Sequence, residues 1–165
     1  MKILGGSYQE TCEVPGSDVV VGSGLRAAGA IAEVAMPTLH TAVDGIFQVE
    51  VELAAGGLHV ELSWVERDKP VGFHYFTPIS RPTISGPQAV ADALHVEGDV
   101  VLAFGMVECG ERAVDCRRLV IDPQRPQDSS RLDLGPYRHE QLALVCNSSE
   151  IRALGSGVGG VPDLV

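Results

Sequence analysis

Two side chains with metal- and phosphate-binding chemistry stand three residues apart near the end of the chain, Asn147 and Glu150. They follow the apolar run 142–146, which predicts a buried strand, and they fall where a helix is expected to begin. Amide and carboxylate oxygens at such a place are suited to magnesium and phosphate chemistry. Fifteen residues follow Glu150, and they are rich in glycine. We therefore expect the rest of such a site to come from outside this chain.

Other motifs with chemical potential are incomplete. Ser7 lacks the Gly-x-Ser-x-Gly frame of a nucleophile elbow. The turn Gly22-Ser-Gly24 lacks the third glycine of a dinucleotide fingerprint, and 155–160 lacks the lysine of a phosphate-binding loop. The four cysteines contain no Cys-x-x-Cys pair and the histidines are scattered, so the sequence argues against a zinc site and for buried, reduced thiols.

Composition limits the class of protein. The chain has 165 residues, 45% of them hydrophobic, which suits one domain with its own core. Twelve basic and 22 acidic residues give a net charge of -10, which disfavours binding to nucleic acid or to an anionic membrane. No apolar run is long enough to span a bilayer, and the N-terminus lacks the layout of a signal peptide. We expect a cytoplasmic protein.

Short apolar runs bounded by turn residues predict parallel strands, with helices between several of them. The alanine-rich stretch 25–34 and the stretch 87–94, which begins with proline, are the expected helices. This alternation predicts an α/β fold with a Rossmann-like, mostly parallel sheet and flanking helices. The expected strands are 2–5, 38–43, 99–104, 118–121 and 142–146.

The middle of the chain has a different pattern. Residues 47–53 and 58–64 alternate apolar with polar side chains, which predicts a hairpin with one wet face, and 71–76 could add a strand. We expect 45–78 to form a small β lid, with 155–165 as a flexible tail. The polar side chains assigned to the wet face are Glu50, Glu52, His59 and Glu61.

Several segments, taken in order, resemble ribokinase-like carbohydrate and nucleoside kinases, the PfkB family. They are Gly6-Ser7-Tyr-Gln-Glu-Thr11, Gly22-Ser-Gly24-Leu-Arg26, Thr41-Ala-Val-Asp44 and Asn147-Ser-Ser-Glu150. The resemblance implies one truncated ribokinase-like domain over 1–165, with the hairpin region as its lid. It also implies a link of Asn147 and Glu150 to magnesium and phosphate handling.

The same resemblance implies a set of substrate-binding residues, namely Glu10, Thr11, Gly22, Gly24, Arg26 and Asp44. Two positions depart from the family pattern: Val21 stands where a glycine is usual, and Arg26 where an asparagine binds sugar hydroxyls. Arginine is a permanent cation whose forked donors suit carboxylate or phosphate, which indicates an altered or anionic ligand. The alternative is that Arg26 simply faces solvent early in its helix.

Family members are much longer, and the Gly-Ala-Gly-Asp element that holds their catalytic base has no counterpart here. We assign no catalytic residue, and expect Mg and ATP only if a second half completes the site. The predicted function is a sugar- or nucleoside-binding subdomain, either a pseudokinase or one half of a split kinase with a complementing chain. The alternative is a non-catalytic interaction module that forms a homodimer through the lid sheet.

Overall fold

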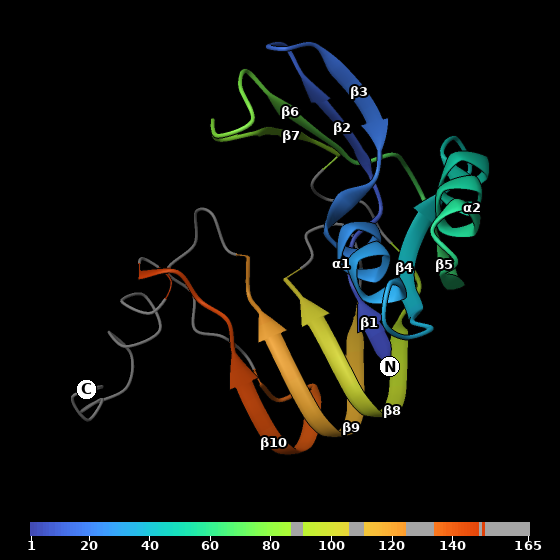
Figure 1. The fold of residues 1–165 in the computed structure, drawn as a ribbon, viewed down its shortest axis with the longest axis vertical. Coiled ribbons are helices and arrows are strands. Elements are labelled where there is room, and N and C mark those ends of the chain that lie inside the picture. The colour runs from blue at the N-terminus through green and yellow to red at the C-terminus, as the bar shows by residue number, and fades with distance from the viewer. Residues whose placement is uncertain (87–90, 106–110, 125–133, 149, 151–165) are drawn as a thin grey trace.

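The computed structural model describes residues 1–86, 91–105, 111–124, 134–148 and 150. In these residues the chain forms an α/β fold of two sheets and two helices (Figure 1). This confirms the fold class expected from the alternating pattern. The elements are β1 (Lys2–Leu4), β2 (Gln9–Cys12), β3 (Ser17–Val20), α1 (Gly22–Ala32), β4 (Thr38–Asp44), α2 (Gln48–Gly57), β5 (Glu61–Arg67), β6 (Gly72–Tyr75), β7 (Thr83–Ser85), β8 (Leu94–Phe104), β9 (Arg112–Asp122) and β10 (Tyr137–Leu144).

The larger sheet has six parallel strands in the order β10-β9-β8-β1-β4-β5. All five apolar runs of the sequence contribute a strand to it. Both helices cover one face, where Ile3, Leu25, Leu39 and Val51 are fully buried. Strands in a parallel sheet are expected to be apolar on both faces, since both faces need cover.

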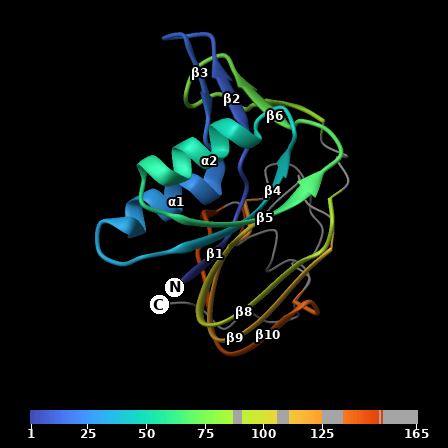
Figure 2. The same cartoon turned by 90° about the vertical axis from the view of Figure 1, so that its right-hand side faces the viewer.

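The opposite face is covered by strands rather than by helices. Each of β8, β9 and β10 folds back on itself, and the first arms form a second layer behind the main sheet (Figure 2). The pairing skips one residue at each bend, at Asp99, Arg117 and Glu140. We call the first arms, residues 94–98, 112–116 and 137–139, the β-arch layer. The inward side chains of both arms form a second core cluster.

The bends themselves carry a charge ladder. The Asp99 carboxylate accepts hydrogen bonds from Arg117 Nε at 2.6 Å and from Arg118 Nη2 at 3.0 Å. The hydrogen bond to Asp99 raises the pKa of Arg117, and the charge of Glu140 adds to this. Asp99 on β8, Arg117 on β9 and Glu140 on β10 thus alternate in charge across three neighbouring strands. Opposite charges on adjacent strands are a favourable arrangement for cross-strand pairs.

The predicted hairpin is wrong. Residues 48–57 form α2, and β5 pairs in parallel with β4 in the main sheet. Asp44 Oδ1 accepts hydrogen bonds from the N–H groups of Ile46 and Phe47, which turns the chain into α2. In the helix Val51 and Ala55, four residues apart, face the core, whereas Val49 and Leu53 stay exposed. The period of two was therefore misleading, because Val49, Val51 and Leu53 do not share one buried face.

A small four-stranded sheet does lie above the main one, in the order β3-β2-β6-β7. We call it the lid sheet. Only β6 comes from the predicted lid segment 45–78, so that assignment is wrong for most of its length. The helix expected over 87–94 is also wrong where it can be described, since Ala91 bridges to Arg67 and β8 begins at Leu94. Residues 87–90 and the expected tail 155–165 lie outside the described residues.

The two faces of the lid sheet differ. Its outer face is polar: Thr11 Oγ1 and His74 Nδ1 are 2.7 Å apart, and His74 Nε2 and Ser85 Oγ are 3.1 Å apart. Phe73 and Ile84 are on its inner face and pack with the buried Tyr8 and Val71. Within the residues described, neither helix has the length and apolarity that crossing a bilayer requires.

Candidate ligand site at the carboxyl edge of the sheet

The strand order places a topological switch point beside β1. The chain runs from β1 through α1 to β4 on one side, and β8 flanks β1 on the other. Ligands of open parallel sheets bind outside the carboxyl ends of the strands at such a point. Here that position is occupied by the turn Gly5-Gly6-Ser7 after β1, with Phe104 at the end of β8. The lid sheet stands over this edge (Figure 1).

The predicted glycines are needed for backbone packing at this turn. Gly24 N donates to Gly6 O at 2.9 Å, and a Cβ on Gly24 would lie 2.7 Å from Gly5 C and O. Gly22 has a φ of +87°, and a Cβ there would lie 2.5 Å from Gly6 O. Both glycines therefore let the start of α1 sit directly on the turn after β1. Their predicted contact with a ligand stays a prediction.

Glu10 and Arg26 are brought together across the junction between the lid sheet and α1. Arg26 Nη1 and Nη2 donate to Glu10 Oε1 and Oε2 at 2.5 Å and 2.6 Å. The Glu10 side chain is 10% exposed, while that of Arg26 is 56% exposed. The hydrogen bonds from Arg26 to Glu10 raise the pKa of Arg26. The charge that was expected to face a ligand is thus already paired, with further guanidinium N–H donors facing outward.

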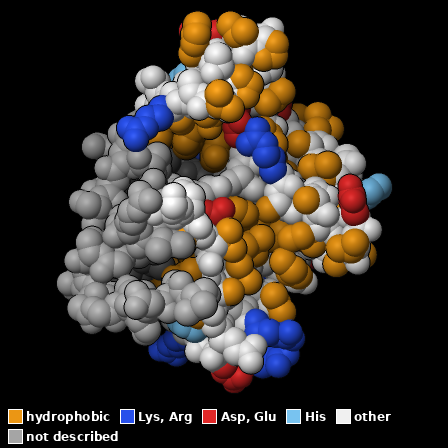
Figure 3. Space-filling model, turned by 60° about the vertical axis from the view of Figure 1, so that its left-hand side comes forward, with side chains coloured by type: hydrophobic (Ala, Val, Ile, Leu, Met, Phe, Trp, Pro, Cys, Tyr) orange, Lys and Arg blue, Asp and Glu red, His pale blue; other side chains and the backbone are white. Residues whose placement is uncertain are grey.

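Aromatic groups surround this pair. Tyr8 and Phe73 stack with their ring centroids 4.2 Å apart. Burial raises the pKa of Tyr75, and the nearby Glu10 charge raises it further. Figure 3 shows hydrophobic side chains beneath the lid sheet and on the body below it, with acidic and basic side chains between them. The inner side of the lid therefore combines aromatic surface with a carboxylate and a guanidinium.

Thr11 lies apart from Glu10, although the two are neighbours in the sequence. Successive residues of a strand point to opposite faces, and the hydroxyl of Thr11 meets His74 on the outer face of the lid sheet. Of the two candidates, Glu10 is the one that approaches α1.

Asp44 is buried and fully engaged within the protein. Its Oδ2 accepts a hydrogen bond from Arg67 Nη2 at 2.6 Å, and its Oδ1 receives two backbone N–H groups at the start of α2. The Arg67 side chain is completely buried, and its Nε and Nη1 have no hydrogen-bond partner among the described residues. Sequence reasoning overlooked Arg67. Arg67 ends β5 and pairs with Asp44 at the end of β4. Its role could not be found from the local sequence, because only the pairing of the two strands brings it beside Asp44.

Asn147 and Glu150 bond to each other. Asn147 N donates to Glu150 Oε2 at 2.8 Å, and Glu150 N donates to Asn147 Oδ1 at 3.0 Å. This reciprocal pattern is that of a capping box, with asparagine in the capping position. The spacing that indicated phosphate chemistry therefore has a local structural use. A role in binding metal or phosphate stays a prediction.

Asp122 and Cys146 lie near Glu150 at the same edge. Burial raises the pKa of Asp122, and the charge of Glu150 adds to it. Burial also raises the pKa of Cys146. The described cysteines are free thiols, and only Cys116 is fully buried. Among the described residues, acidic, histidine and cysteine side chains form no group of three that could hold a metal ion.

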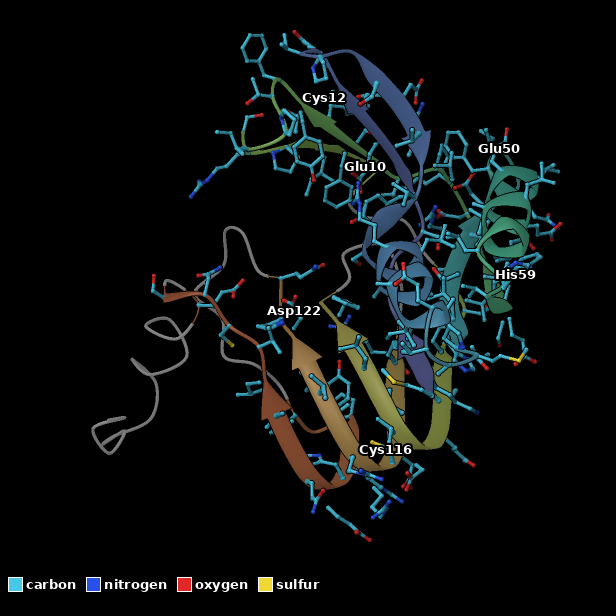
Figure 4. The ribbon with its side chains drawn as sticks, viewed as in Figure 1. Glu10, Cys12, Glu50, His59, Cys116 and Asp122 are labelled. Carbon is cyan, nitrogen blue, oxygen red and sulfur yellow. The ribbon has the colours of Figure 1, made fainter. Side chains whose placement is uncertain are left out.

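The site candidates therefore separate into three places. Glu10 and Arg26 lie between the lid sheet and α1, Asp44 lies at the end of β4, and Glu150 lies beyond β9 and β10. In Figure 4, Glu10 is on the underside of the lid sheet and Asp122 is at the upper end of β9. Glu50 and His59 lie on the helix side, away from both.

No protein-family model matches the sequence, and no curated protein matches it either. Two solved structures are similar in fold. One is a pyrophosphate-dependent kinase in the ribokinase family, complexed with a pyrophosphate analogue and myo-inositol, with a TM-score of 0.49 and 10% identity. The other is a mutant of phosphofructokinase-2 from Escherichia coli, with a TM-score of 0.44 and 12% identity.

The two alignments cover 73% and 74% of this chain. The chain spans 60% and 54% of the length of the two kinase structures.

Proposed function

We propose that the chain binds a small polyhydroxylated ligand, a sugar or a nucleoside, between the inner face of the lid sheet and the turn after β1. The single observation that carries this proposal is the Glu10–Arg26 pair, held between the lid sheet and α1 beside the switch point of the sheet. A carboxylate of low exposure is a strong acceptor for ligand hydroxyl groups, and charge-assisted hydrogen bonds are the stronger kind.

The surroundings support this ligand class. The stacked Tyr8 and Phe73 and the half-buried Tyr75 provide aromatic surface. Such surfaces bury the apolar face of a sugar or a base while a polar group at the edge fixes its orientation. Arg26 keeps N–H donors that Glu10 does not use, and these fit a ligand that also carries a carboxylate or phosphate.

Two versions of the activity follow. In the first, the chain binds without transferring a phosphoryl group, as a pseudokinase. In the second, another chain or segment supplies the base and the nucleotide site, and Mg and ATP enter with it. Phosphoryl transfer depends mainly on positioning and on stabilising charge at the transferred group. Asn147 and Glu150, which already bond to each other, supply only a small part of the positioning and charge stabilisation that phosphoryl transfer needs.

The test is a thermal shift measurement with ribose, adenosine and a sugar phosphate. A ligand at 100 times its dissociation constant stabilises the folded state by about 2.7 kcal/mol, so the melting temperature rises measurably. We expect Glu10→Gln and Arg26→Ala to reduce the shift. The control is Arg138→Ala, which removes an exposed arginine from the β-arch layer and should leave the shift unchanged. A panel that gives no shift at any concentration would remove the basis of the proposal.

A second measurement separates the two versions. The purified chain is incubated with Mg-ATP and the sugar that gives the largest shift, and phosphorylated sugar is measured. The pseudokinase version predicts binding without product. Phosphorylated sugar that forms with the unchanged chain but not with Glu10→Gln would show that the chain transfers phosphate without another chain or segment. That result would contradict both versions.

A further inference from the structure

The edge strand β10 ends the main sheet with its apolar side chains uncovered. Leu142 and Leu144 are 37% and 45% exposed, and Val145, just beyond the strand, is also exposed. No described strand pairs with the outer edge of β10. Figure 1 shows this strand on the open side of the sheet, opposite the side that carries β5. A hydrophobic edge with unpaired backbone groups is a template for pairing with another strand.

The exposed leucines continue two columns of the inner core. In the pairing register, Leu142 is level with Leu119 and Val101, and Leu144 is level with Ile121 and Ala103. The residues of β8 and β9 in these columns are buried, and only the last member of each is exposed. The core therefore runs to the edge of the sheet, and within the described part of the chain no strand covers its last members.

We propose that β10 pairs with β10 of a second copy of this chain, antiparallel, about a two-fold axis at Ala143. A closed dimer uses the same patch on both subunits, and two-fold pairing of sheet edges is antiparallel. The sequence Leu142-Ala-Leu144 is symmetric about its centre. In this register Leu142 of each subunit faces the partner's Leu144, and the sheet becomes continuous across the dimer.

The flanking residues are compatible with this register. The bend at Glu140 limits the paired segment to residues 141–145, where Gln141 falls opposite the partner's Val145 and no residue is charged. Like charges directly opposite would destabilise the pair. The net charge of -10 on each subunit opposes association at long range. Screening by salt should therefore strengthen the dimer.

The oligomeric state of the intact chain tests the proposal. Sedimentation velocity between about 1 and 100 μM should show a monomer–dimer equilibrium, because an edge interface is small compared with those of tight dimers. Leu144→Lys should weaken association at least tenfold, since it buries a charge at both symmetric contacts. The matched control is Leu53→Lys on α2, where the side chain is 71% exposed and the dissociation constant should not change.

Cysteine cross-linking tests the register. In a background with Cys12, Cys109 and Cys146 changed to serine and Cys116 to alanine, Ala143→Cys should form an intermolecular disulfide on mild oxidation, because the two side chains meet at the axis. Gln141→Cys should not, since its copies are four strand positions apart. A monomer at every concentration overturns the proposal. So does a dimer that survives Leu144→Lys, which would point to the lid sheet, or equal cross-linking at 141 and 143.

Discussion

The carboxylate of Glu10, on β2 of the lid sheet, is held by both terminal nitrogens of Arg26, on α1. The pair spans 16 residues of sequence and ties the lid to the layer of helices. We expect Arg26→Ala to lower the free energy of unfolding by about 1 kcal/mol or less, because solvent screens an arginine that is more than half exposed. Hydrogen exchange should reveal faster opening of β2 and β6 than of β4. Equal protection of the β2 and β6 amides in Arg26→Ala and in the unchanged protein would mean that the pair does not restrain the lid.

The buried pair of Asp44 and Arg67 predicts a much larger effect. Asp44→Asn leaves the Arg67 guanidinium buried without a counter-charge, and breaking one side of such a pair costs about 3–5 kcal/mol. Urea unfolding measures this loss. The matched control is Asp115→Asn, which breaks the exposed pair with Arg138 and should change stability by less than about 0.5 kcal/mol. Similar losses in the two variants would contradict the role given to burial.

Two glycine substitutions in helices should act in opposite directions. Gly24→Ala forces a Cβ to 2.7 Å from the Gly5 backbone, and overpacking of this kind costs about 1–3 kcal/mol. Gly56→Ala meets no atom within 4 Å, so the higher helix propensity of alanine should stabilise α2 by up to about 1 kcal/mol. Thermal unfolding of the two variants checks both signs. A neutral Gly24→Ala would show that α1 can move away from the turn after β1.

His40 predicts a dependence of stability on pH. Burial of its side chain on β4 lowers the pKa of His40 below its ordinary value of 6.5, with a further contribution from Lys2 and an opposing one from Glu61. The folded state thus binds fewer protons than the unfolded state just below pH 6.5. The stability from neutral His40 is present above that pH and is lost as the pH falls toward the folded-state pKa.

His40→Gln should therefore flatten the acid side of the stability curve, measured as the urea midpoint at a series of pH values. His95→Gln, at an exposed position of β8, should leave the slope unchanged. The same slope in His40→Gln and in the unchanged protein would assign the acid sensitivity to the carboxylates instead.

The sequence by itself determined the α/β fold class and located five of the six strands of the main sheet. The largely apolar run 38–43 forms a buried strand of the parallel sheet, as such runs favour. The apolar run 142–146 contributes the edge strand of the same sheet, where Leu142 and Leu144 stay partly exposed. It also identified the Asn147–Glu150 spacing and the helix start there. A spacing of three serves a capping box and a phosphate site equally well, however, and only the hydrogen bonds between the two residues show the first use.

Tertiary structure decided the rest. Val49 and Val51 alternate with glutamates as they would in a strand, but the parallel pairing of β4 with β5 requires a crossover connection, and α2 provides it. At the bends at Asp99 and Arg117 the buried side chains change from even to odd positions, as from Val96 to Val101 in β8. The pairing of both arms in one fold shows why the alternation shifts there. Glu10 and Arg26 were separate candidates in the sequence. They became one site because the lid sheet, built from segments far apart in the chain, places one directly against the other.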